Sequence, residues 1–226
     1  MREYLLMAAM FTPFLGLNAQ DDPEYLMEIG GGVGVVSYQG DFNGNIVKNL
    51  QPAGSVLLRR NFNPYMGLRL TASYGKLKGH SGQVSTYYPD YQEATYTFNS
   101  SLADLSLTYE YNFWPYGTGR DYRGAKRLVP FISGGIGATY VWGGEKNVFT
   151  ANIPLGLGLR YKLKERLNLG IEWMMHFSLS DELDGVKDPY KVPSSGMFKN
   201  SDSYSILQIT LTYSFKEKCK TCNNDE

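Results

Sequence analysis

The stretch Ile153–Leu163 reads IPLGLGLRYKL and places a large apolar side chain at every odd-numbered position. The even positions between them hold a proline, two glycines, an arginine and a lysine. A period of two residues is the pattern of a β-strand, because successive side chains of a pleated backbone point to opposite faces. The apolar face could pack on a second sheet in a soluble sandwich, or contact lipid in a membrane barrel.

Seven other segments alternate in a similar way, least clearly the second one, in which Leu57 and Leu58 adjoin. The eight predicted strands cover residues 25–38, 53–60, 66–74, 101–114, 129–142, 149–163, 167–177 and 207–215. Strands of about ten residues can cross a bilayer at a tilt, whereas strands of soluble proteins usually have about five or six residues. The pattern therefore predicts an all-β fold, an eight-stranded antiparallel transmembrane up-and-down β-barrel.

The connections between these segments alternate in length, as they do in outer-membrane barrels with short periplasmic turns and longer external loops. The predicted long connections are residues 39–52, 76–97, 143–148 and 178–203, and the short ones are 61–64, 115–127 and 164–166. Two of them blur the pattern, because 143–148 is short for an external loop and 115–127 is long and basic. Aromatic residues gather near the strand ends, which suits a membrane interface. The glycines of the inner face leave room in a narrow barrel.

The ends of the chain predict export. Residues 1–19 carry a cation at Arg2, an apolar stretch and a small residue at Ala19, which is the pattern of a cleaved signal peptide. We therefore divide the chain into a signal peptide (1–19), an outer-membrane β-barrel (20–215) and a periplasmic tail (216–226). The formal net charge is +0, which gives no electrostatic reason to expect nucleic acid as a partner.

The predicted strand faces turn several charged side chains toward the barrel interior. This interior charge network comprises Glu28, Arg59, Arg69, Asp104, Glu110, Arg160, Lys162 and Glu172. Opposite charges in a confined interior should pair, because an unpaired buried charge is costly. A barrel of eight strands is filled by its own side chains. We therefore expect a salt-bridged plug that holds the strands in register, rather than a path for ions or protons.

Few residues suit catalysis or metal binding. The two histidines are His80, in a polar loop where we expect it to be solvated, and His176, on the inner face where we expect a hydrogen-bonded role. Neither has the spacing of a nucleophile, base and acid around it. No cluster of metal-ligating residues is apparent. We predict no enzyme activity, no catalytic residue, no metal site and no cofactor.

The tail contains the only cysteines, Cys219 and Cys222, in a Cys-x-x-Cys spacing. A zinc site would need two more ligands, and a thioredoxin-type centre would need a strand and helix that are absent from the pattern. Two interpretations stay open, an internal disulfide or an exposed thiol that cross-links a periplasmic partner. Both require an oxidising compartment, in agreement with export.

Three stretches carry a resemblance to a known family. The opening strand EIGGGVGVVSYQGDFN (28–43), the hairpin NFNPYMGLRLTASYG (61–75) and the ending LTYSFKEKCKTC (211–222) resemble the PorG type of outer-membrane barrel, from the type IX secretion system of Bacteroidota. The resemblance covers nearly the whole mature chain.

This resemblance implies a non-enzymatic outer-membrane component with its short turns and tail in the periplasm. Its partners would be outer-membrane lipid and a periplasmic ring of PorK-type lipoprotein and PorN-type protein. It would tether that ring to the outer membrane, supporting cargo export and, in some species, gliding motility. The resemblance also implies a disulfide from Cys219 or Cys222 to the ring lipoprotein. The alternatives are a small barrel enzyme that acts on lipid A, or an OmpA-like structural barrel or narrow pore.

Overall fold

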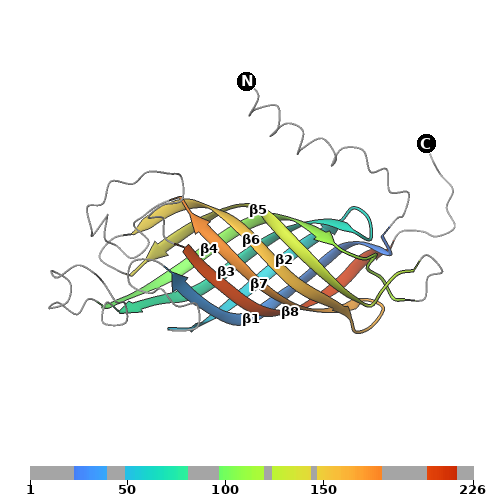
Figure 1. Cartoon of the computed structure of the whole chain (residues 1–226), viewed down its shortest axis with the longest axis horizontal. Helices are drawn as coiled ribbons and strands as arrows, with labels where there is room; N and C mark the ends of the chain where they lie inside the picture. Colours follow the sequence, from blue (N-terminus) through green and yellow to red (C-terminus); the bar gives the residue numbers. More distant parts are fainter. Residues whose placement is uncertain are drawn as a thin grey trace, which may run out of the picture.

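The computed structural model describes residues 23–39, 49–80, 97–119, 124–143, 147–179 and 203–217, which form eight long strands (Figure 1). The strands are β1 (Tyr25–Gln39), β2 (Gln51–Asn61), β3 (Met66–His80), β4 (Thr97–Asn112), β5 (Leu128–Trp142), β6 (Val148–Lys162), β7 (Leu167–Ser178) and β8 (Ser203–Glu217). The predicted signal peptide and both cysteines lie outside the described residues.

Each strand pairs antiparallel with the next along the chain, and β8 pairs with β1 to close the barrel. The closing pair is long, since it runs from Tyr25 opposite Glu217 to Gln39 opposite Ser203. Figure 1 shows β1 in blue beside β8 in red, with all strands tilted across the barrel axis. The predicted fold class, a closed eight-stranded antiparallel barrel, is confirmed.

The outer wall of the barrel is apolar and its interior is polar. Outward-facing side chains such as Val33 (72% exposed), Ile136 (68%) and Leu157 (54%) are open to the surroundings, whereas inward-facing Glu28, Arg69 and Glu172 are almost completely buried. A water-soluble protein buries its apolar side chains and exposes its charges. The reversed arrangement belongs to a barrel surrounded by lipid, because hydrocarbon tails then cover the apolar wall. Within the described ranges, no helix is long and apolar enough to cross a membrane.

Three predicted strands were several residues too short at the end with the long connections. β3 continues past Tyr74 to His80, β4 begins at Thr97 instead of Ser101, and β8 begins at Ser203 instead of Leu207, so residues 76–80 and 97 of the predicted loop 76–97 belong to strands. In this part the polarity reverses, because Lys76 and Lys78 face outward while Leu77 is fully buried. The sequence interpretation assigned the segment to a loop because its outward positions are polar.

At this end of the barrel, where the polarity is reversed, inward-facing side chains form a small apolar core. Its buried members are Val36, Tyr38, Leu77, Leu102, Val141, Tyr204 and Ile206. Apolar packing inside and lysines outside are features of a barrel surrounded by water. This end of the barrel therefore projects beyond the apolar zone of the wall.

The opposite end of the barrel holds the short connections and both ends of the described chain. Residues 62–65 join β2 to β3, residues 163–166 join β6 to β7, and residues 113–127 join β4 to β5. Phe113 and Trp114, which we assigned to a strand, lie in this last connection. β8 extends two residues past the predicted end at Phe215. Tyr25 and Glu217 pair at this same end, which we call the short-turn end.

Candidate functional site

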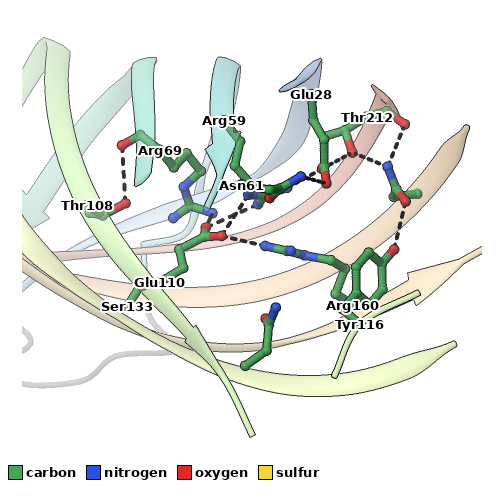
Figure 2. A network of polar contacts seen from close by, with 12 residues as sticks. Glu28, Arg59, Asn61, Arg69, Thr108, Glu110, Tyr116, Ser133, Arg160 and Thr212 are labelled. Atoms are coloured by element: carbon green, nitrogen blue, oxygen red, sulfur yellow. Dashed lines mark hydrogen bonds and ion pairs between the residues drawn. The ribbon is translucent and has the colours of Figure 1, made fainter. Parts of the chain in front are cut away.

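Glu110 of β4 is the centre of a charged network that crosses the barrel interior (Figure 2). Its carboxylate accepts hydrogen bonds from Arg59 Nε at 2.7 Å, and it lies 2.9 Å from Arg69 Nη1. Arg160 of β6 donates a third contact to the same carboxylate. All four side chains are buried. Three guanidinium groups thus share one carboxylate inside the barrel.

Two further carboxylates complete the network. Glu28 of β1 accepts from Arg59 Nη1 at 2.5 Å and from Asn61 and Thr212 at 3.0 Å each. Glu172 of β7 accepts two parallel hydrogen bonds from Arg69, at 2.8 and 2.6 Å. Bidentate arginine–carboxylate pairs of this kind are the strong ones, since both groups are ionised and their geometries match.

The network joins strands across the barrel as well as along its wall. Arg69 on β3 and Glu172 on β7 come from opposite sides, because three strands lie between them in either direction around the closed order. Ser133 of β5 and Gln208 of β8 also donate to Glu172, at 3.3 Å each. Thr212 of β8 donates a hydrogen bond to Glu28, and side chains from all eight strands take part in the network. Three arginines face three glutamates, so the network is close to neutral and fills the lumen with paired charge.

Two of the eight predicted interior charges are buried but make their contacts elsewhere. Lys162 lies 3.1 Å from Glu24 at the short-turn end. Asp104 lies nearer the end with the long connections. Its Oδ2 accepts hydrogen bonds from Asn152 at 2.7 Å, Tyr204 at 2.9 Å and Thr139 at 3.1 Å. The remaining six, which are Glu28, Arg59, Arg69, Glu110, Arg160 and Glu172, form the network around Glu110.

His176 belongs to the cluster around Asp104. Its Nδ1 is 3.8 Å from Asp104 Oδ2 and 3.4 Å from Asn152 Oδ1, and its ring stacks on Tyr204 at a centroid distance of 4.5 Å. The hydroxyl groups of Thr139 and Tyr204 contact the carboxylate of Asp104. Asp104 Oδ1 is buried and has no hydrogen-bond partner. His80 is the last residue of β3, and its side chain is not among those that the structure describes.

The connection between β4 and β5 folds against the short-turn end of the lumen. Tyr116 reaches Asn168 with its hydroxyl at 2.8 Å, and its ring lies 5.1 Å from the Arg160 guanidinium and 5.4 Å from the Lys162 ammonium. Burial raises the pKa of Tyr116 above its usual value. A cavity of about 20 Å³ remains here, beside Glu24 and Tyr116, with room for about one water molecule. Tyr116, which belongs to the long basic turn that blurred the predicted pattern, therefore covers the barrel mouth.

Glu24, which precedes β1, binds the connection between β4 and β5. Its Oε1 accepts hydrogen bonds from the backbone N–H and the hydroxyl of Thr118, both at 2.8 Å. Burial alone would raise the pKa of Glu24, but these hydrogen bonds and the Lys162 ammonium outweigh burial and hold the pKa below its usual value. Sequence reasoning missed Glu24 and Tyr116, because neither lies on a predicted inward strand face.

The lowered pKa of Glu24 predicts an acid-sensitive contact. A carboxyl with a depressed folded-state pKa stabilises the protein above its unfolded pKa, and this contribution is lost as the pH falls through the folded value. We expect Glu24→Gln to lose less stability than the parent protein when the pH is lowered from 6 to below the ordinary carboxyl value of 4.5. Thermal unfolding at both pH values measures this difference. Equal acid losses in the two proteins would contradict it, and Glu165→Gln, in an exposed turn, is the control.

No group of three or more His, Cys, Asp or Glu side chains that could hold a metal ion occurs within the described ranges. In the described part of the interior, ion pairs and hydrogen bonds join strand to strand.

Comparison with known proteins gives a family and several structures of similar fold. The sequence matches, over residues 6–224, a family described as "Domain of unknown function (DUF6089)". No curated protein matches the chain by sequence.

Among solved structures, similarity extends over most of the chain at low identity. Neisserial surface protein A (NspA) is 12% identical with a TM-score of 0.49, covering 84% of this chain and 97% of its own. The outer membrane protein OprG from Pseudomonas aeruginosa is 12% identical with a TM-score of 0.48, covering 87% and 99%. Ail, the attachment invasion locus protein of Yersinia pestis, is 12% identical with a TM-score of 0.47, covering 85% and 100%.

Proposed function

The chain belongs to the DUF6089 family, whose description assigns no function, and we propose that it is a non-enzymatic outer-membrane barrel that anchors a periplasmic protein assembly. The assembly that we propose is the PorK/PorN ring of the type IX secretion system, which would support cargo export and, in some species, gliding. The resemblance of residues 28–43, 61–75 and 211–222 to the PorG type supports this choice. The observation that carries the anchoring role is the lumen, which is filled by the network around Glu110.

The filled lumen argues against transport through the barrel. Ion pairs link opposite walls, since Arg69 of β3 binds Glu172 of β7. The apolar core that includes Leu77 and Leu102 fills the lumen at the end with the long connections, and Tyr116 covers the short-turn end. To pass through the barrel, a solute would have to break several buried ion pairs. Breaking each pair leaves a buried charge without its partner, which is costly. The barrel therefore acts as a rigid body in the membrane.

The position of His176 argues against an enzyme that acts on lipid. Its side chain is 1% exposed and stacks on Tyr204 inside the lumen. A lipid outside the wall cannot reach it, and a catalytic base must come within hydrogen-bond reach of its substrate. Function then falls to the surfaces at the two ends of the barrel.

The short-turn end carries the partner-binding surface in this proposal. Glu217, the last residue of β8, lies there and precedes Cys219 by two positions in the sequence. If this end faces the periplasm, the tail leaves the barrel on the side where a periplasmic ring would lie. A cysteine in an oxidising compartment can then form a disulfide with a partner lipoprotein.

Copurification in non-reducing conditions tests the proposal. We expect the protein from native membranes to carry a periplasmic ring component and to migrate as a larger, reductant-sensitive species on a non-reducing gel. The double variant C219S/C222S should lose the larger species. The single variants C219S and C222S separate the two interpretations of the tail, because a cross-link needs one cysteine whereas an internal disulfide needs both.

Two results would overturn the proposal. One is a wild-type protein that copurifies with no periplasmic protein by this procedure or after chemical crosslinking of intact cells. The other is a bound periplasmic protein unrelated to secretion, which would keep the anchoring role but reject the type IX assignment.

A further inference from the structure

A ring of cations surrounds the short-turn end of the barrel, and we propose that it binds the headgroups of anionic phospholipids. We call these residues the basic rim: Arg60, Lys126, Arg127, Lys164, Arg166 and Lys216. All six are exposed. The inference rests on the membrane-spanning barrel and does not depend on the secretion role.

The basic rim holds six of the eight exposed lysines and arginines of the described ranges. The other two, Lys76 and Lys78, lie at the opposite end. The lipid-facing wall between the two ends has none among the described residues. Among the described residues, only two exposed acids accompany the rim, Glu165 and Glu217, and Glu217 lies 3.3 Å from Arg166. The described residues therefore give this end six exposed cations against two exposed acids.

The rim follows the whole circumference of the barrel. Arg60 is on β2, Lys126 and Arg127 precede β5, Lys164 and Arg166 lie between β6 and β7, and Lys216 is on β8. A protein partner that docks on one side would require a single patch. A membrane surface encircles the barrel, and the placement of the rim matches that geometry.

Three of the rim cations, on different elements, border the apolar wall. Arg60 lies two residues beyond Leu58 on the same outward face, while Arg127 precedes Leu128 and Lys164 follows Leu163. Leu58, Leu128 and Leu163 are 40–52% exposed. Long cationic side chains at the edge of an apolar surface can lay their stems on it and extend their charge toward the headgroups.

Aromatic rings hold several rim cations at this level. The Lys126 ammonium lies 4.3 Å from the ring centroid of Trp114, the Arg60 guanidinium 5.7 Å from that of Phe62, and the Arg166 guanidinium 5.6 Å from that of Tyr25. Trp114 and Phe62 are themselves exposed, at 45% and 46%. Such rings prefer the interface between hydrocarbon and headgroup, so the cations beside them lie at the depth of the phosphates. Phosphatidylglycerol has a net negative charge there, while phosphatidylcholine is zwitterionic.

Fluorescence quenching by brominated lipid measures this preference at Trp114. The chain has three tryptophans, Trp114, Trp142 and Trp173. The variant W142F/W173F keeps the reporter of the rim, and W114F/W173F keeps a reporter at the opposite end. Each is folded into vesicles of phosphatidylcholine mixed with phosphatidylglycerol, with one lipid brominated near the headgroup. A basic residue near an anionic surface contributes about 1 kcal/mol, which is a factor of about five in local lipid affinity.

The lipid preference is the local affinity for phosphatidylglycerol divided by that for phosphatidylcholine, as measured by quenching. We expect this ratio to be about five or more at Trp114 at low salt, and near one at Trp142. Adding K126Q/R127Q to the Trp114 reporter should bring its ratio close to one, while the matched pair K76Q/K78Q should leave it unchanged. About 1 M salt should also abolish the preference, because it shortens the screening length to about 3 Å. The salt arm tests the proposal even if a charge variant fails to fold.

A ratio near one for the wild-type rim at low salt would overturn the proposal. So would a preference that persists in both K126Q/R127Q and high salt. If no lipid preference is found and K126Q/R127Q instead loses a copurifying periplasmic protein, the rim is a protein contact.

Discussion

Replacing Glu110 with alanine is expected to lower the free energy of unfolding by about 3–5 kcal/mol, the cost of leaving buried charge without its partner. Arg59, Arg69 and Arg160 all bind this carboxylate, so the variant leaves three buried guanidinium groups facing only Glu28 and Glu172. Urea unfolding in lipid vesicles, followed by tryptophan fluorescence, measures the change. The shift in migration between heated and unheated samples on gels reports whether the barrel still closes.

A charge-balanced double variant separates charge from packing. Glu110→Gln combined with Arg160→Gln removes one charge of each sign, and we expect it to recover more than half of the stability that Glu110→Ala loses. Glu165→Ala, at an exposed position in a turn, should change stability by less than about 0.5 kcal/mol. If Glu110→Ala unfolds within about 1 kcal/mol of the parent, which is the size of an exposed pair, the network is not a major source of stability.

Replacing Gly135 with alanine should be about as damaging, for a steric reason. A Cβ atom at Gly135 would lie 2.0 Å from the carbonyl oxygen of Leu107 and 2.8 Å from the Cα of Thr108, both in the backbone of β4. Neither strand can move without disturbing the pairs that close the barrel. Overpacking a well-filled site costs about 1–3 kcal/mol and occasionally more, and we expect the upper part of this range because backbone is contacted. The same unfolding assay in vesicles measures it.

Gly54 provides the matched control for this substitution. It faces outward on β2, and a Cβ atom there would have its nearest neighbour at 3.8 Å, which is an ordinary contact. Gly54→Ala should therefore fold with a stability close to that of the parent. Similar losses in Gly54→Ala and Gly135→Ala would show that chain conformation, and not space between strands, decides the role of these glycines.

Much of the barrel could be predicted from residue alternation. The odd-numbered leucines of Ile153–Leu163 are exposed on the outer wall, and Arg160 and Lys162 between them are buried. Even the ambiguous second strand obeys the rule, since Leu57 is buried and Leu58 is exposed. The alternation is readable because lipid and lumen demand opposite chemistry on the two faces of each strand.

The alternation gave wrong strand ends beyond the apolar wall, where the outward side chains are polar. Leu77 and Leu102 point inward and Lys76 and Lys78 point outward, so the residues beyond the apolar wall resemble a loop in the sequence although they extend β3 and β4. The mouth of the barrel could not be predicted either. Tyr116 and Glu24 come from outside the strands, and their contacts depend on where residues 116–118 of the connection lie against the barrel.

By itself, the sequence determined that the chain forms eight long strands with one apolar and one polar face, because a period of two residues is a local property of the backbone. It also determined which charged side chains enter the lumen. Only the tertiary structure decided that Arg69 binds Glu172 across the barrel, that Lys162 turns to Glu24, and that Asp104 lies with His176. Partners of this kind are distant in sequence, and they meet only when closure of β8 on β1 sets the radius and register of the interior.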